Sequence, residues 1–324
     1  MLKTERRSTN WVCWTIGTCL AVVIAAPRPS AAQSRFAEVV VFGTSLSDPG
    51  NAFVLVGDQS TPPDFMLNPL LIPSAPYAKG GHHFSNGATW IEQFAWSVGL
   101  GGSVNAALAN SSAKASNFAV GAARAYDDGV NFNLTRQAAT FLERSGGGAP
   151  GEALYVIEMG SNDVRDAFAL FATGGNGAPI ISKALESIAT NIGRLYAAGA
   201  RDFLVWVTPN VALTPAIRSL GPVAGGLAAQ LTQVFNGGLA QTLAQLAVVL
   251  PGTSFARLDA YRLLNDIVAN PAAFGLTNAT SACVTPSTPP FTCNQADEYL
   301  FWDGIHPTKA GHAILAEEAA RVLR

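Results

Sequence analysis

The sequence predicts an α/β fold with three layers, in which helices cover both faces of a mostly parallel central sheet. Short, continuous apolar runs alternate along the chain with longer segments whose apolar residues recur at helical spacing. Strands of a parallel sheet are buried on both faces, so they read as unbroken apolar runs. The chain has 324 residues, 49% of them hydrophobic, which is enough for a large core of this kind.

The strands and helices follow from these two patterns. The predicted strands are the apolar runs at residues 38–42, 154–158, 202–207 and 253–258. The predicted helices are residues 89–98, 134–144, 183–198, 224–249 and 309–323. In the third helix Leu185, Ile188 and Ile192 share one face, and Gly199 follows as a stop signal. Strands that alternate with helices of this length favour a parallel sheet.

Residues 1–32 are typical of a secretory signal peptide. Lys3, Arg6 and Arg7 precede an apolar run, which ends in a stretch of small residues. The run is shorter than the roughly 20 residues that a membrane-spanning helix needs. We therefore expect cleavage after Ala32 and a protein that is secreted or periplasmic. An uncleaved N-terminal anchor is the alternative.

Residues 33–324 contain no linker, so we expect a single domain without a stable membrane span. Only 13% of the chain is charged, the net charge is −2, and no cluster of basic residues occurs, which argues against a nucleic-acid partner. After cleavage Cys283 and Cys293 are the remaining cysteines. An even pair in an exported protein predicts a disulfide bond, and no neighbouring ligand residues indicate a metal site.

Polar residues follow the predicted strands where an α/β sheet binds its ligands, beyond the carboxyl ends. Ser45 comes directly after the first strand, on a turn that starts with glycine. Asp303 and His306 are three residues apart in a loop before the last helix. That spacing allows the carboxylate to bind one imidazole nitrogen while the other accepts a serine proton. A helix-capping serine and an Asx-turn aspartate are the structural alternatives.

Two further positions could stabilise a developing negative charge. Asn162 follows the second strand, where its amide N–H can face an oxyanion. Gly121 lies in the segment NFAVGAA and permits close approach of a backbone N–H. The alternative for Asn162 is a helix N-cap.

Together and in this order, these motifs resemble the GDSL lipase/esterase family, also called SGNH hydrolases, in its plant-lipase-like branch. The motifs are Gly43-Thr44-Ser45-Leu46-Ser47-Asp48, Gly121 within NFAVGAA, Gly160-Ser161-Asn162-Asp163 and Asp303-Gly304-Ile305-His306-Pro307-Thr308. The resemblance extends over nearly the whole chain after the signal peptide. It implies the three-layer, flavodoxin-like fold of SGNH hydrolases.

The resemblance also implies roles. Ser45 would be the nucleophile, His306 the general base and then acid, and Asp303 the residue that orients the imidazole. The backbone N–H groups of Ser45 and Gly121, with the side chain of Asn162, would form the oxyanion hole. The reaction would be hydrolysis of a small-molecule or lipid ester through an acyl-enzyme, without metal or organic cofactor.

One departure and two alternatives accompany this expectation. The family has Asp before the serine, and this chain has a threonine, Thr44. Because that Asp is not the triad acid, we expect activity to survive. An acyltransferase would use the same triad with an alcohol in place of water, and a binding module could keep the fold without catalysis. The sequence does not predict an oligomeric state.

Overall fold

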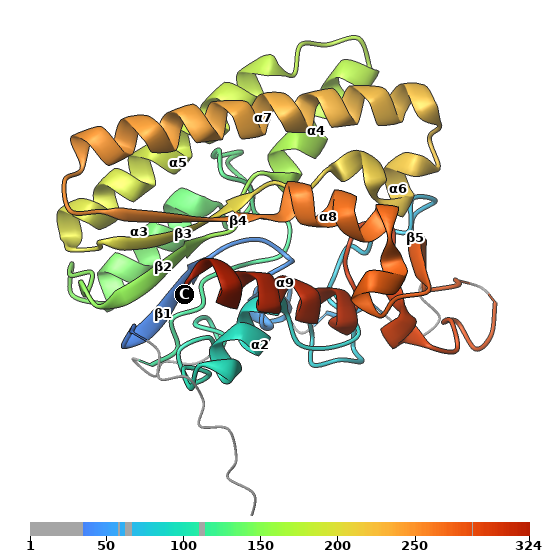
Figure 1. Ribbon diagram of the computed structural model, residues 1–324, viewed down its shortest axis with the longest axis horizontal. Helices are drawn as coiled ribbons and strands as arrows, with labels where there is room; N and C mark the ends of the chain where they lie inside the picture. The colour runs from blue at the N-terminus through green and yellow to red at the C-terminus, as the bar shows by residue number, and fades with distance from the viewer. Residues whose placement is uncertain (1–34, 58, 62–66, 110–113, 287) are drawn as a thin grey trace, which may run out of the picture. The chain divides into compact units, whose positions relative to one another are not determined.

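Four parallel strands form the central sheet of the computed structural model (Figure 1). They lie in the order β1 (Glu38–Phe42), β2 (Ala153–Ile157), β3 (Asp202–Val207) and β4 (Ser254–Asp259). The structure describes residues 35–57, 59–61, 67–109, 114–286 and 288–324. The predicted parallel sheet is confirmed, with strand ends that differ by at most one residue. The predicted signal peptide lies outside the described residues.

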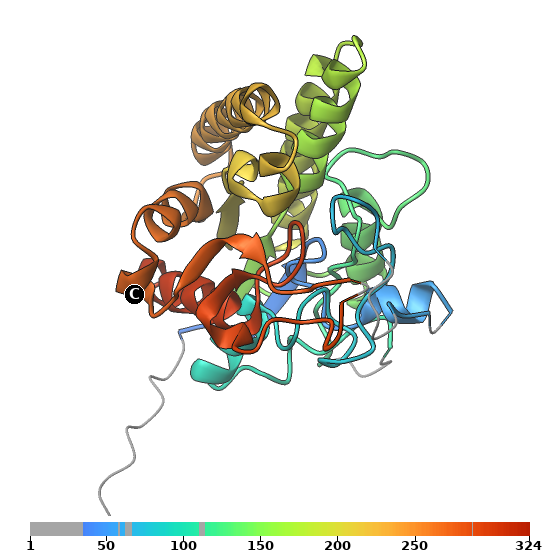
Figure 2. The ribbon, with the colours of Figure 1, turned by 90° about the vertical axis from the view of Figure 1, so that its right-hand side faces the viewer.

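A short segment pairs with the free edge of β1 and extends the sheet by one strand. The N–H of Val41 donates to Ser116 O (2.9 Å), and the N–H of Phe118 donates to Val41 O (2.8 Å). With this segment included, the strand order is the flavodoxin-like 2-1-3-4-5. The order reverses between β1 and β2, so the carboxyl ends of these two strands are the expected ligand site. Figure 2 looks onto this end of the sheet, where the loops after the strands gather.

Helices cover both faces of the sheet and bury one hydrophobic core on each (Figure 1). One face carries α3 (Leu134–Arg144), α4 (Ser161–Ala172), α5 (Ala178–Ala198) and α7 (Pro222–Val249). The other carries α2 (Trp90–Ser97), α8 (Ala260–Ala269) and α9 (Lys309–Val322). Neighbouring strand residues point to opposite cores: Val40 and Phe42 to the first, Val39 and Val41 to the second.

Smaller elements complete the described part of the chain. They are α1 (Asn51–Leu55), α6 (Pro215–Arg218), three 3₁₀ turns (Val211–Leu213, Pro271–Phe274, Ala296–Glu298) and the parallel pair β5 (Asn278–Ala282) with β6 (Tyr299–Phe301). Cys283, just after β5, forms the predicted disulfide bond with Cys293. Among the described residues, no helix is long and apolar enough to cross a bilayer.

The longest helix, α7, runs unbroken through the pair Gly237-Gly238 in its middle, which lowers its intrinsic helix propensity. Tertiary packing overrides that propensity. A Cβ at Gly238 would lie 2.4 Å from Leu185 Cδ1 on α5, so the glycine lets the two helices approach closely. Phe235 and Leu239, on the same helix, are fully buried in the core.

Candidate active site

Ser45, His306 and Asp303 meet at the carboxyl end of the sheet and are joined by hydrogen bonds. His306 Nε2 lies 2.9 Å from Ser45 Oγ, and His306 Nδ1 lies 2.7 Å from Asp303 Oδ2. Asp303 is fully buried and His306 is 3% exposed, while Ser45 is 9% exposed at the base of a cleft. The structure therefore brings together three residues that are up to 261 positions apart in sequence.

The loop around Asp303 explains how one carboxylate serves both the turn and the imidazole. Asp303 Oδ1 accepts the backbone N–H groups of Ile305 (2.9 Å) and His306 (2.8 Å), which is an Asx turn. Its other oxygen, Oδ2, binds the imidazole. The residue after Asp303 must be glycine, because a Cβ at Gly304 would lie 1.9 Å from Leu70 O. Asp303 is therefore both the Asx-turn residue and the partner of His306, so the two interpretations of the sequence are compatible.

Tyr77 is a fourth member of this chain of hydrogen bonds and was not predicted from the sequence. Its hydroxyl donates to Asp303 Oδ2 (2.8 Å), and its ring packs edge-on against Trp302. Burial and the adjacent carboxylate raise the pKa of Tyr77, so it stays protonated as a donor. No local motif marks Tyr77, which is 226 residues from Asp303.

Behind the serine, Thr44 binds a buried carboxylate. Its N–H donates to Glu158 Oε2 (2.8 Å), and its hydroxyl lies 3.1 Å from Glu158 Oε1. Glu158 is fully buried at the end of β2, and burial raises its pKa to about 8. An aspartate at position 44 would set a second carboxylate against Glu158. The threonine therefore fits the glutamate opposite it, which accounts for the departure from the family motif.

Asp48 organises the turn after Ser45 and also engages Gly121. Its carboxylate accepts the N–H groups of Gly50 (2.8 Å), Asn51 (2.6 Å) and Ala52 (3.0 Å) at the start of α1. It also accepts the Gly121 N–H at 2.7 Å. Gly121, expected as an oxyanion donor, is thus at the cleft but directs its N–H at Asp48. Burial raises the pKa of Asp48 to about 6.

Gly121 has a steric reason to be glycine. A Cβ there would lie 2.2 Å from Phe84 Cε2. The Phe84 ring in turn packs against the imidazole of His306, with ring centroids 5.4 Å apart. The next residue, Ala122, has a left-handed backbone (φ 65°), so the chain turns sharply away after the glycine.

Asn162 sits in the first turn of α4 with its side-chain amide held from both ends. Its Nδ2 donates to Ala123 O (2.8 Å), and its Oδ1 accepts from Arg165 Nη1 (3.0 Å). An amide has two N–H groups, so one remains for a ligand in the cleft. Asn162 is 6% exposed and lines the cleft beside Ser45.

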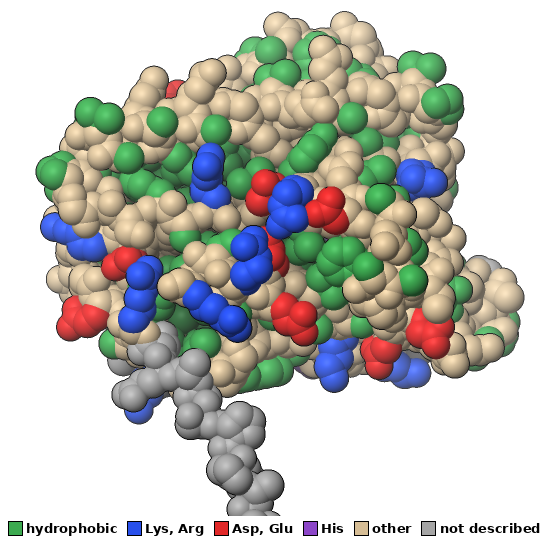
Figure 3. Space-filling model, viewed as in Figure 1, with side chains coloured by type: hydrophobic (Ala, Val, Ile, Leu, Met, Phe, Trp, Pro, Cys, Tyr) green, Lys and Arg blue, Asp and Glu red, His purple; other side chains and the backbone are tan. Residues whose placement is uncertain are grey.

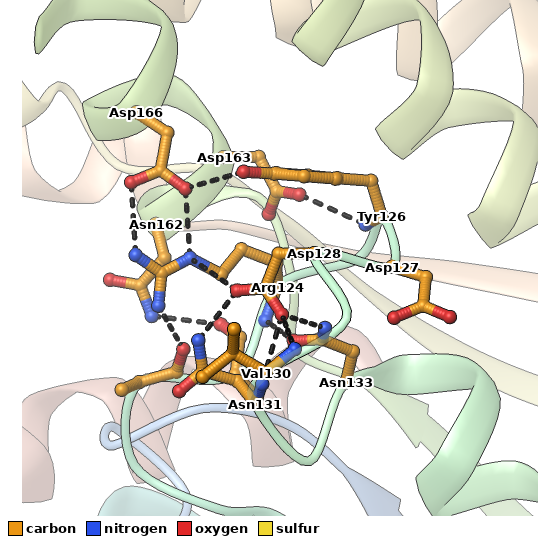
Figure 4. Close-up of polar contacts among 12 residues, drawn as sticks. Arg124, Tyr126, Asp127, Asp128, Val130, Asn131, Asn133, Asn162, Asp163 and Asp166 are labelled. Carbon is orange, nitrogen blue, oxygen red and sulfur yellow. Dashed lines mark hydrogen bonds and ion pairs between the residues drawn. The ribbon is translucent and has the colours of Figure 1, made fainter.

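A polar network holds the loop that follows Gly121 against α4 (Figure 4). Asp163 accepts the backbone N–H groups of Ala125 and Tyr126. Asp166 binds Arg124 through both oxygens (2.8 and 2.9 Å) and accepts the Tyr126 hydroxyl. Further along the loop, Asp128 accepts N–H groups from Val130, Asn131 and Asn133. This network was not predicted from the sequence, where its one signal is that Asn162, Asp163 and Asp166 fall within one turn of a helix.

Two hollows meet at Ser45 and His306. The larger, of about 280 Å³, is walled by Pro73, Phe84 and Gly121 among others. The smaller, of about 40 Å³, lies between Leu46, Ser161, Pro209, Val211 and Thr214. Asn162, Arg165 and Ile305 line both of them.

Residues 39–319 match the family of GDSL-like lipases/acylhydrolases, and the chain belongs to this family. Among similar proteins of Arabidopsis thaliana, one GDSL esterase/lipase is 29% identical over 51% of this chain and 49% of its own length. A second is 27% identical over 91% of this chain and 86% of its own. The chain spans about half the length of the first curated relatives that it matches. A crystal structure of a Bacillus subtilis protein is similar over 88% of this chain and 56% of its own, with 13% identity and a TM-score of 0.42.

Proposed function

We propose that the protein hydrolyses carboxylic esters through Ser45, His306 and Asp303. The observation that carries the proposal is the continuous chain of hydrogen bonds from Ser45 Oγ through His306 to Asp303 at the floor of a cleft. This arrangement suits a serine nucleophile, a base that takes its proton and a carboxylate that orients the base. Membership of the lipase/acylhydrolase family supports the same reaction class.

In the first half-reaction Ser45 Oγ attacks the ester carbonyl carbon while His306 Nε2 takes the hydroxyl proton. The tetrahedral intermediate then collapses, the bond to the alcohol oxygen breaks, and His306 returns the proton to the departing alcohol. In the second half-reaction water attacks the acyl-serine, again with His306 as base, and releases the carboxylic acid. Asp303 keeps Nδ1 protonated, and Tyr77 supports that carboxylate.

We assign the oxyanion hole to the Ser45 N–H and the free N–H of the Asn162 side chain. Their support is the position of both residues in the cleft wall and the anchoring of the Asn162 amide by Ala123 and Arg165. Donors of this kind are each worth roughly 3 kcal/mol in the transition state. Gly121 contributes its N–H to the hole only if that group turns away from Asp48.

The test is hydrolysis of nitrophenyl esters of rising acyl length by the purified protein and its variants. We expect Ser45→Ala to lower kcat about a thousandfold or more, and His306→Ala to lose nearly as much because the triad acts as a unit. Ser182→Ala, on the exposed face of α5, is the matched control and should keep wild-type rates.

A wild type no faster than Ser45→Ala would reject the hydrolase and favour a binding module. Faster turnover when an alcohol acceptor is added, with formation of a new ester, would identify an acyltransferase. Cleavage by the wild type together with a fully active His306→Ala would reject the assigned base.

We also propose that the protein is exported, with cleavage after Ala32. The disulfide bond between Cys283 and Cys293 supports an oxidising compartment. N-terminal sequencing of protein recovered outside the cytoplasm tests it: a mature chain that begins at Gln33 is expected, and an intact N-terminus would contradict it.

A further inference from the structure

Arg165 lies in the cleft wall and has no carboxylate partner among the residues that the structure describes. Arg165 lines both hollows beside Ser45. Its one hydrogen bond within the described part of the chain goes to the amide oxygen of Asn162, a neutral group, at 3.0 Å. Arg165 is only partly exposed, so its guanidinium has lost part of its hydration without a carboxylate among the described residues to replace it. Burial indeed lowers the pKa of Arg165.

The neighbouring Arg124, by contrast, is paired with carboxylates. Its guanidinium is bidentate on Asp166, and Asp128 lies 3.7 Å from its Nε. The carboxylates that act electrostatically on Arg165 are Asp166 and Asp303. Each of these has its own partner, Arg124 and His306 respectively. Among the described residues that line the two hollows, no acidic side chain is present.

A second polar group without a partner among the described residues lies beside the smaller hollow. The hydroxyl of Ser161 is buried and has no hydrogen-bond partner in the described structure, and Ser161 lines the smaller hollow together with Arg165. Ser161 is the first residue of α4, where backbone N–H groups point out of the helix and favour negative charge. A guanidinium, a free hydroxyl and a helix N-terminus together provide the donors that a carboxylate accepts.

We propose that Arg165 recognises a carboxylate on the substrate, so that the preferred substrates are esters that carry a negative charge close to the scissile bond. The inference rests on the proposed ester hydrolysis and adds a substrate class to it. The carboxylate would form a charge-assisted, bidentate pair with Arg165 and would replace the solvation that this side chain lacks. The charge can sit on the acyl side or on the alcohol side of the ester, because Arg165 borders both hollows.

Two pairs of synthetic esters distinguish a charge on the acyl side from a charge on the alcohol side. On the acyl side, nitrophenyl hemiadipate is compared with the neutral nitrophenyl adipamate. On the alcohol side, 3-acetoxybenzoate is compared with the neutral 3-acetoxybenzamide. The readout is the ratio of kcat/KM for the charged ester to that for its neutral partner, after subtraction of spontaneous hydrolysis. We expect this ratio to be about 10 or more in one pair, and to fall as salt is added.

Variants then assign the preference to one side chain. Arg165→Gln keeps a donor for Asn162 but removes the charge, so the ratio should fall about tenfold, whatever happens to the rate on the neutral ester. Arg165→Lys should keep most of the preference. Arg194→Gln, on the exposed surface of α5, removes one positive charge far from the cleft and should leave the ratio unchanged.

The ratio separates this proposal from other roles. A loss of rate that is equal on charged and neutral esters would mean that Arg165 only positions Asn162, and would overturn the proposal. A wild type without preference in either pair would overturn it even if Arg165→Gln does not fold. Failure of ester hydrolysis itself would appear instead as a wild type equal to Ser45→Ala on the neutral esters.

Discussion

At the scale of single residues, the site contains two buried carboxyl groups, those of Asp303 and Glu158, whose surroundings differ. Asp303 is fully saturated by donors: two backbone N–H groups, an imidazole and the Tyr77 hydroxyl. Glu158 instead accepts only a few bonds, chiefly from Thr44, in a fully buried position. Burial therefore dominates and raises the pKa of Glu158 to about 8, so its protonated form predominates at pH 7.

A pH-dependent stability follows from Glu158. In the unfolded chain its pKa is near 4.5, so between pH 6 and 8 only the folded state retains the proton. The folded state thus binds more protons, and the free energy of unfolding should fall as pH rises across this window, by up to about 1.4 kcal/mol per pH unit. Burial also raises the pKa values of Asp48 and Asp163, to about 6. These two groups should therefore lower the free energy of unfolding as pH rises in the same way, mainly below pH 6.

Urea unfolding of the wild type and Glu158→Gln at pH 6, 7 and 8 measures this contribution. We expect the variant to lose part of the slope, whereas the exposed Glu143→Gln should keep it. Identical slopes in wild type and Glu158→Gln would show that Glu158 is already ionised at pH 6.

At the scale of elements, α4 joins the cleft beside Ser45 to the rest of the fold. Its first turn supplies Asn162 to the cleft, and Asp163 and Asp166 hold the loop that begins at Gly121. The helix starts directly after β2, because Gly160 adopts a positive φ of 118°. A Cβ at Gly160 would lie 2.3 Å from Thr208 Oγ1, so glycine is also required for packing at this point.

We expect Asp163→Ala to disturb both stability and activity. The change leaves the buried N–H of Ala125 and that of Tyr126 without their acceptor, at a cost of about 1–3 kcal/mol. It also frees the loop after Gly121, so kcat/KM for a neutral ester should fall about tenfold or more. Thermal unfolding and ester hydrolysis provide the two measurements.

Asp127→Ala is the matched control in the same loop. Asp127 is exposed, and within the described part of the chain its side chain accepts only the Gly129 N–H, so its removal should change stability by less than about 0.5 kcal/mol. Equal effects of the two substitutions would contradict a specific role for Asp163.

At the scale of the whole molecule, the low charge of the sequence reflects two cores and an unusually neutral helix. Both faces of the sheet are covered, which places most apolar residues inside. Figure 3 shows charged side chains in a band across the middle of one face and hardly any along α7 at its top. Ion pairs of Glu318 with Arg262 and Arg321 also tie α9 to α8. The 28-residue helix α7 has no charged residue and exposes Val223 and Val248.

The disulfide bond braces the region behind the triad. Cys283 is buried in a small cluster with Tyr77, Val284 and Trp302. Replacement of both cysteines by alanine should lower the free energy of unfolding by about 2–3 kcal/mol, as expected for a loop of this length. A reducing agent should lower the Tm of the wild type but not that of the double variant. A wild type whose Tm is unchanged after complete reduction would contradict this role.

The sequence by itself predicted the class of fold and the four strands, which the structure confirms, and it indicated Ser45, Asn162, Asp303 and His306 as candidate site residues. Those features depend on residues that are close together in sequence, namely apolar runs and the short motifs that follow strands. The tertiary structure alone decided that Gly121 gives its N–H to Asp48, that Thr44 faces Glu158, and that Tyr77 supports Asp303. It also revealed the edge strand beside β1, which is too short and too polar to be read as one. In each case the partners are 73 to 226 residues apart, and only the folded chain sets their distance. Arg165 is a similar case, because only the folded chain shows that no carboxylate of the described residues pairs with it.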